Sequence, residues 1–148
     1  MSVDERELQE HRLREEGRKI SRALLVGVYM QNTDKELCEE HLDELELLSQ
    51  TYGFEVIAKV PVLLRKYDVS TYLTKGKLEE VVAMAESLEP DLLIFDDEIA
   101  PSQQRNLEKI FKHTVMDRTE LIIEVFAQRA QTKEARLQVE LEIGRAHV

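Results

Sequence analysis

Three consecutive acids, Asp96, Asp97 and Glu98, are the side chains whose types and spacing first suggest chemistry. They follow the apolar run 92–95 in the stretch LLIFDDEIAPSQQRNLEKI. In an open parallel sheet, ligands bind beyond the carboxyl ends of the strands. A Mg²⁺ ion uses one or two protein carboxylates and commonly a phosphate. Asp96 and Asp97 are therefore candidate metal ligands.

The companions that such a metal site needs are not found in the sequence. Receiver and phosphatase-like folds add a second acidic strand end near the N-terminus and a lysine after a later strand. The first apolar run instead ends in Met30, Gln31 and Asn32, and no carboxylate follows before Asp34. In the alternative interpretation, the acids are solvated at a strand end, near the positive N-terminus of a helix that begins at Pro101. We favour this alternative.

No other group of residues forms a recognised catalytic pattern, and we predict no catalytic residue. A nucleophile elbow of the Gly-x-Ser-x-Gly type does not occur. The four histidines have no pairing at a spacing of four residues, which a metal site on one helix face would need: His11, His41, His113 and His147.

The turn TKGK at 74–77 comes closest to a phosphate-binding loop. A Walker A loop has a glycine five positions before its Gly-Lys pair and Ser or Thr after it, but Thr71 and Leu78 stand at those positions. The turn is therefore not a P-loop. The backbone amides of a helix N-terminus can still bind a phosphate, so Lys75, Gly76 and Lys77 are candidates for such a site.

Length and charge limit the classes of protein. A chain of 148 residues with 43% hydrophobic residues is large enough for one domain with a real core. The net charge of −10 argues against a general binder of nucleic acid. The charge is uneven, because residues 101–136 hold seven Lys and Arg against five acids and residues 1–100 hold twelve against twenty-three. This distribution allows a local basic face in the C-terminal third.

Cysteine usage and hydropathy indicate a soluble, cytoplasmic protein. Cys38 is the single cysteine, which excludes an internal disulfide and fits a reducing compartment. Its place in an apolar helical stripe favours a buried small hydrophobe over a nucleophile. The first residues are too charged for a signal peptide, and no apolar run approaches the roughly 20 residues that span a bilayer.

Hydrophobic periodicity predicts the elements that position these residues. Apolar runs indicate strands at 23–30, 54–64, 91–95 and 114–116, and Pro61 limits the second of these to an edge, an end or a bulge. Thr33 and Glu36 form a capping box ahead of a helix that Gly53 ends. After a polar link, a second helix is predicted at 77–88. A third helix begins at Pro101, and a fourth begins after a cap formed by Asp117 and Glu120.

Strand and helix therefore alternate about four times, which predicts an α/β fold. We expect a small parallel sheet of about four strands with helices on both faces, in the strand order 2-1-3-4. Residues 1–19 form a charged N-terminal extension, and residues 20–131 form the α/β domain. Residues 132–148 are thinly apolar and helical, and they begin a projecting C-terminal helix.

The segments TYLTKGKLEEV, DLLIFDDEIAPSQQRNLEKI and VMDRTELIIEVFAQRAQTKEARLQVEL, in this order, closely resemble the N-terminal domain of the HflX family of translational GTPases. The resemblance runs from about Ala23 to Leu141. It implies an α/β domain, followed by a pair of long antiparallel helices and a P-loop GTPase domain. It also implies a stress-related factor that binds the large ribosomal subunit and its RNA and splits or rescues stalled ribosomes.

The GTP and Mg²⁺ that the resemblance implies belong to that following GTPase domain. No GTPase signature occurs in these 148 residues, so we expect no cofactor and no enzymatic activity in this chain. We expect its partners to be the large subunit, ribosomal RNA and its own GTPase domain. The alternative is a nucleotide- or Mg-binding α/β domain with its own small-molecule or enzymatic activity, built on Asp96, Asp97 and the turn at 74–77.

Three positions depart from the family pattern. Thr74 begins a turn that usually reads Gly-Lys-Gly-Lys, and Ala100 stands where Ser or Thr normally caps a helix, a loss of about 1 kcal/mol unless another group covers the amides. After Leu141 the family continues as an apolar, basic helix. Residues 143–148 match one reading frame of a common sequencing adapter, and we expect them to be non-native.

RNA docking needs cations directed at phosphates and planar groups that bond or stack. The candidates for RNA contact are Gln103, Arg105, Arg118, Arg129, Lys133 and Arg136. In the competing interpretation, Arg118 forms an internal pair with Asp117, and Gln104 or Asn106 satisfies buried backbone groups at strand ends. We favour Arg129 and Arg136 as exposed residues.

Overall fold

The computed structural model describes residues 20–131, which form one four-stranded sheet. The strands are β1 (Arg22–Tyr29), β2 (Glu55–Leu63), β3 (Leu92–Phe95) and β4 (Thr114–Asp117). Their order is β2-β1-β3-β4, and every neighbouring pair is parallel. The predicted α/β class, the four parallel strands and the order 2-1-3-4 are confirmed.

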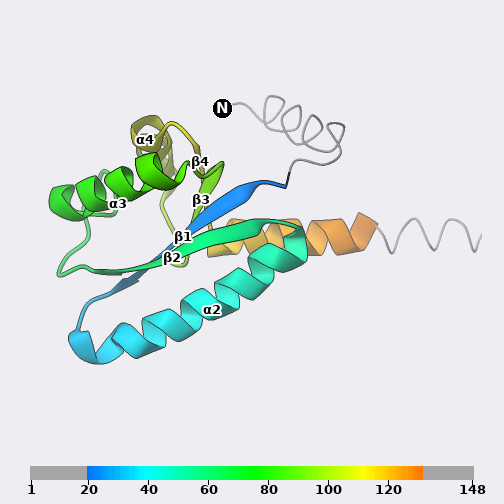
Figure 1. Cartoon of the computed structure of the whole chain (residues 1–148), viewed down its shortest axis with the longest axis horizontal. Coiled ribbons are helices and arrows are strands. Elements are labelled where there is room, and N and C mark those ends of the chain that lie inside the picture. Colours follow the sequence, from blue (N-terminus) through cyan, green and yellow to red (C-terminus); the bar gives the residue numbers. More distant parts are fainter. Residues whose placement is uncertain (1–19, 132–148) are drawn as a thin grey trace, which may run out of the picture.

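Helices cover both faces of this sheet. A short 3-10 turn, η1 (Asn32–Asp34), leads into α2 (Lys35–Tyr52), and α3 (Lys75–Leu88) and α4 (Pro101–Phe111) follow. A last helix begins at Arg118 and continues to residue 131, where the described residues end. α3 and α4 pack on one face, whereas α2 and the last helix pack on the other (Figure 1).

The strands alternate between two apolar cores. In β1, Leu24 and Val26 belong to the core beneath α3 and α4, whereas Ala23 and Leu25 belong to the core beneath α2. Successive side chains of a strand point to opposite faces, and here both faces are covered by helices. This is why β1 and β3 read as unbroken apolar runs rather than as alternating ones.

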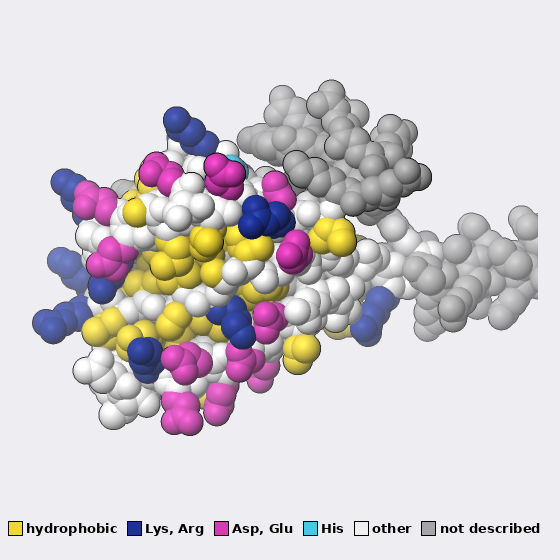
Figure 2. Space-filling view, in the orientation of Figure 1, with side chains coloured by type: hydrophobic (Ala, Val, Ile, Leu, Met, Phe, Trp, Pro, Cys, Tyr) yellow, Lys and Arg dark blue, Asp and Glu magenta, His cyan; other side chains and the backbone are white. Residues whose placement is uncertain are grey.

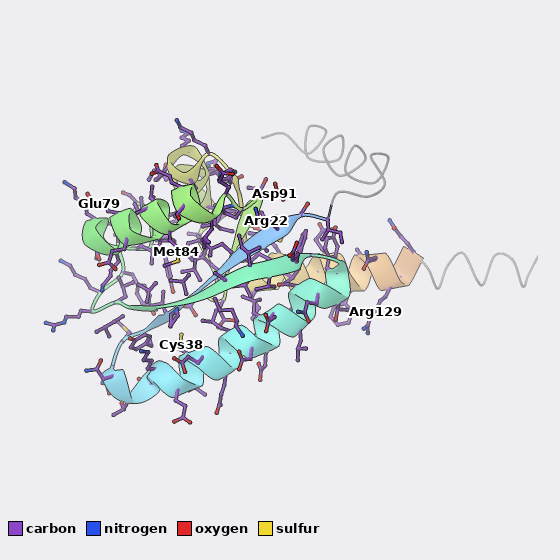
Figure 3. All side chains as sticks on the ribbon, viewed as in Figure 1. Arg22, Cys38, Glu79, Met84, Asp91 and Arg129 are labelled. Carbon is purple, nitrogen blue, oxygen red and sulfur yellow. The ribbon has the colours of Figure 1, made fainter. Side chains whose placement is uncertain are left out.

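α2 approaches β1 closely at Gly27. A Cβ added to Gly27 would lie 3.0 Å from Cys38 Sγ and 3.0 Å from Leu42 Cδ2. Cys38 is buried, as predicted, and Figure 3 shows it on α2 close to the sheet. Burial, together with nearby carboxylates, raises the pKa of the Cys38 thiol to about 11, which makes it a poor nucleophile.

Most predicted boundaries agree within two residues, but the capping box of Thr33 and Glu36 is wrong. The amide of Asp34 bonds to the carbonyl oxygen of Gln31 at 2.9 Å, so Thr33 lies inside the tight turn η1, and α2 starts after it. At the other end of α2, Gly53 has φ 117°, the left-handed conformation that glycine adopts without strain. The helix therefore ends where the sequence predicts.

β2 lies at one edge of the sheet, as Pro61 indicates. Residues 1–19 and 132–148, including the predicted projecting helix and the suspected non-native end, lie outside the described residues. The division of the chain into these segments therefore stays a prediction. Within residues 20–131, no helix combines the length and the apolar character needed to cross a bilayer.

Candidate functional site

Asp96 lies at the carboxyl edge of the sheet, directly after β3, and is neutralised by an arginine. Arg118 directly follows the neighbouring strand β4, and its Nη1 contacts Asp96 Oδ1 at 2.7 Å. Arg118 Nη2 also contacts Glu44 Oε2 on α2 at 3.0 Å. The Asp96 side chain is only 11% exposed, so this ion pair is largely shielded from solvent. The network ties two strand ends to α2.

Asp97 is bound by a tyrosine from the connection between β2 and α3. The Tyr72 hydroxyl donates a hydrogen bond to Asp97 Oδ2. Burial raises the pKa of Asp97, and this hydrogen bond acts against that rise. Burial and the neighbouring carboxylate also raise the pKa of Tyr72, so its hydroxyl remains a donor. Tyr72 also has a left-handed backbone conformation, with φ 65°.

Asp96 and Asp97 do not make a suitable magnesium site with the residues around them. The charge of Asp96 is compensated by Arg118, and Asp97 accepts a hydrogen bond from the Tyr72 hydroxyl. Among residues 20–131, no group of three or more His, Cys, Asp and Glu side chains is arranged to hold a metal ion. The expectation that the acids are solvated is also wrong for Asp96, and of the three only Glu98 is classed as exposed.

Asp117 caps the last helix and fixes a turn at the same time. Its Oδ1 accepts the amide of Glu120 at 2.9 Å, which confirms the predicted cap. Its Oδ2 accepts the amide of Ile99 at 3.0 Å, and the side chain is buried. The suggested pair between Asp117 and Arg118 is wrong. Arg118 does form an internal ion pair, but its partner is Asp96.

The amide side chains of α4 hold other parts of the backbone. Gln103 Nε2 donates to the carbonyl oxygen of Asp68 at 2.9 Å, and its Oε1 accepts the amide of Ala100 at 3.1 Å. Asn106 Nδ2 donates to the carbonyl oxygen of Ser70 at 2.8 Å. Gln103 thus covers an amide at a helix start that lacks a capping side chain. Gln103 and Asn106 brace the β2–α3 connection.

Gln104 makes a third internal contact. Its Nε2 donates to the carbonyl oxygen of Val115 at 2.6 Å and to Glu120 Oε1 at 2.6 Å. The competing interpretation therefore agrees with Gln104, which bonds to a carbonyl group of β4, but not with Asn106, whose partner Ser70 lies in an exposed connection and not at a buried strand end. Two of the candidates for RNA contact, Gln103 and Arg118, have their polar atoms committed to internal bonds.

Arg105 and Arg129 are exposed and lie apart from this network. Arg129 is on the last helix, and Figure 3 shows it directed away from the sheet. Arg105 lines an open hollow of about 480 Å³ at the amino ends of β3 and β4, with Asp91, Glu108, Lys109, Lys112, His113 and Thr114. Lys133 and Arg136 lie outside the described residues.

The phosphate candidates Lys75, Gly76 and Lys77 form the first turn of α3, two residues earlier than predicted. Lys77 Nζ lies 3.7 Å from Glu80 Oε2, which partly neutralises it. Lys75 has no ion-pair partner among the described residues, and a phosphate site at this turn stays a prediction.

Sequence reasoning missed the aromatic residues of the β2–α3 connection. The Tyr67 and Tyr72 rings are stacked, with centroids 4.8 Å apart and planes at 26°. Tyr72 meets Phe95 of β3 edge to face, with centroids 6.3 Å apart. No periodicity marks Tyr67 or Tyr72 in the sequence. The only signal was two aromatic residues in a link that otherwise looked polar.

Comparison with known proteins gives the class of this α/β domain. Residues 39–127 match the family model described as GTP-binding GTPase N-terminal. The GTPase HflX of Chlamydia pneumoniae is 47% identical over 123 residues, covering 82% of this chain and 26% of the relative. The GTPase HflX of Escherichia coli (strain K12) is 35% identical over 119 residues, covering 80% and 27%.

Solved structures agree with the fold. The GDP complex of SsGBP has a TM-score of 0.58 and 24% identity, over 82% of this chain and 33% of that one. A GTP-binding protein from the archaeon Sulfolobus solfataricus, also with GDP, has a TM-score of 0.51 and 22% identity, over 82% and 37%. At these identities the likeness concerns the fold alone.

The family model defines the class of this α/β domain as the N-terminal domain of GTP-binding GTPases. The chain belongs to the HflX family and corresponds to its N-terminal domain. It spans 26% of the length of the Chlamydia pneumoniae relative and 29% of the Flavobacterium psychrophilum relative, which is 42% identical over 120 residues and covers 81% of this chain.

Proposed function

We propose that this chain is the ribosome-docking domain of an HflX-type GTPase that acts in the cytoplasm. In this proposal the domain binds the large ribosomal subunit and its RNA, and the whole protein splits or rescues ribosomes under stress. GTP and Mg²⁺ would be used by a GTPase domain elsewhere in the longer protein.

The observation that carries the proposal is the internal use of the polar groups at the carboxyl edge of the sheet. Asp96, Asp97 and Asp117 each bond to a group of the same chain. Ligand-binding α/β domains keep such groups available for the ligand at this edge. Here they lock strands, helices and one loop together, which favours a rigid domain that presents a surface over one that performs chemistry.

The test is co-sedimentation of the full-length protein with purified large ribosomal subunits, in the presence of GTP and Mg²⁺. The comparison protein lacks residues 1–141. We expect the full-length protein to enter the subunit fraction and the truncated protein to lose most of that association. Equal association of the two proteins would refute a docking role for this domain.

A further inference from the structure

The connection between β2 and α3 is basic, although the chain as a whole is acidic. Residues 65–77 hold four Lys and Arg and one acid, whereas the whole chain carries −10. Figure 2 shows Lys and Arg side chains projecting at the edge where this connection and the start of α3 lie. The three cations Arg65, Lys66 and Lys75 are exposed and have no ion-pair partner within residues 20–131.

The single acid in this segment, Asp68, offsets only part of its positive charge. Asp68 Oδ1 accepts the amides of Ser70 at 2.8 Å and Thr71 at 3.1 Å. Lys66 also acts electrostatically on this carboxylate, and the segment keeps a surplus of Lys and Arg over its one acid.

The same connection ends in an exposed aromatic ring. Phe95, Tyr72 and Tyr67 form a series of ring contacts that leads from the buried sheet to the surface. Phe95 is fully buried and Tyr72 is 7% exposed, whereas Tyr67 is 48% exposed. One face of the Tyr67 ring is stacked on Tyr72, so a nucleotide base would extend this series of rings outward.

The connection is fixed rather than loose. Asp68 and Tyr72 exchange two backbone hydrogen bonds, of 3.0 and 2.9 Å, and α4 holds the segment through Gln103 and Asn106. The Tyr72 hydroxyl pins it to Asp97. A surface held in place before binding avoids the entropy cost of ordering its groups on contact.

We propose that Arg65, Lys66, Tyr67 and Lys75, the β2–α3 patch, form the surface that binds RNA, with the cations on phosphates and Tyr67 stacked on an unpaired base. This inference rests on the proposed docking function and replaces Gln103 and Arg118 as RNA-contacting residues. A chain with net charge −10 is repelled by a polyanion, so its contact face must be where the sign reverses. Exposed aromatic rings beside cations are the usual means of holding unpaired bases.

The hollow lined by Arg105, Lys109 and Lys112 is the other cationic region. Asp91 and Glu108 line it too, and its one ring side chain is that of His113. Its charges are therefore mixed, and none of its lining residues belongs to the series of ring contacts formed by Phe95, Tyr72 and Tyr67. This makes Lys109 and Lys112, which are exposed, a matched control for the β2–α3 patch.

The experiment measures binding of the full-length protein to large subunits and to protein-free ribosomal RNA from those subunits, at several salt concentrations. We expect Arg65→Glu/Lys66→Glu to weaken both by about tenfold or more and to reduce the salt slope by roughly 1.5. Lys109→Glu/Lys112→Glu changes net charge equally and should bind within about twofold of wild type. Tyr67→Ala should weaken binding about tenfold, whereas Tyr67→Phe keeps the ring and should bind normally.

Circular dichroism and thermal unfolding of each variant show whether it has folded. Normal binding by Arg65→Glu/Lys66→Glu, with wild-type protein still bound to subunits, would overturn the assignment of the patch and leave the docking function intact. Weakened binding to subunits with unchanged binding to protein-free RNA would also overturn it, because the patch would then meet ribosomal protein. Wild-type protein that fails to bind subunits would refute the docking function, and the assignment with it.

Discussion

At the scale of single residues, the contact between Tyr72 and Asp97 decides how the β2–α3 connection is held. A carboxylate buried at a strand end loses hydration, and burial raises its pKa. The Tyr72 hydroxyl supplies the hydrogen bond that partly replaces the lost water. Neither residue would be chosen for this role from the sequence, because they lie 25 positions apart and no pattern joins them.

We predict that Tyr72→Phe lowers the free energy of unfolding by about 1–3 kcal/mol at neutral pH, since it leaves a partly buried carboxylate without its donor. The pKa of Asp97 is raised in the folded state, so folding favours the protonated form, and the penalty for its charge disappears as the pH falls. The cost of Tyr72→Phe should therefore shrink as the pH falls from neutral toward the ordinary Asp pKa of 3.8.

Urea denaturation at a series of pH values measures this effect. Asp97→Asn is the comparison, because an amide oxygen still accepts the Tyr72 hydroxyl and carries no charge. A cost of Tyr72→Phe that stays constant over the whole pH range would show that the carboxylate is not the group left unsatisfied.

At the scale of elements, Asp117 joins three parts of the fold. It ends β4, caps the last helix through Glu120, and holds the turn after β3 through Ile99. We predict that Asp117→Ala costs roughly 2–4 kcal/mol of unfolding free energy, because it removes a cap and leaves the Ile99 amide unpaired. Chemical denaturation measures the change.

Asp34→Ala is the control for Asp117→Ala. Asp34 is the N-cap residue of α2, but its side chain makes no capping hydrogen bond, and it is exposed. We expect a change within about 0.5 kcal/mol. Similar losses in the two variants would contradict the assigned role of Asp117.

The packing of α2 on β1 depends on Gly27. We predict that Gly27→Ala lowers the free energy of unfolding by about 1–3 kcal/mol, because the new methyl group would press on Cys38 and Leu42. Gly76→Ala is the matched change in open space at the first turn of α3, and alanine there should be neutral or stabilising. Thermal unfolding compares the two variants, and equal melting temperatures would refute the close approach at Gly27.

At the scale of the whole molecule, the chain is acidic overall with a basic edge. In the proposed docking function, this distribution would turn the basic edge toward the RNA, because electrostatic repulsion between the domain and a polyanion is weakest there. The competing function, a nucleotide- or Mg-binding domain, needs free carboxylates or a phosphate loop, whereas Asp96 and Asp97 are engaged by Arg118 and Tyr72.

We predict that titration calorimetry of this chain with Mg²⁺ and GTP or ATP gives no binding heat. The full-length protein is the positive control, since its GTPase domain should bind GTP. Saturable heat from the chain alone would favour the competing function, and loss of that heat in Asp97→Asn would locate the site.

Family and topology were readable from the residues. Unbroken apolar runs predicted buried parallel strands. Pro61 limited one of them to an edge, an end or a bulge, because it has no amide proton to donate within a sheet, and the structure shows the edge. Asp117 and Glu120 predicted a cap, because that contact spans three residues and depends on local geometry alone. The segments around FDDE and QQRNLE pointed to the HflX family.

Only the tertiary structure decided what the polar side chains do. Arg118 meets Asp96 because β3 and β4 are neighbours with matched ends, and Gln103 meets Asp68 across 35 residues. Such partners follow from strand order and helix placement, which no local pattern encodes. The same holds for Tyr67, whose exposed ring stacks on Tyr72, a residue that tertiary contacts with Asp97 and Phe95 hold in place.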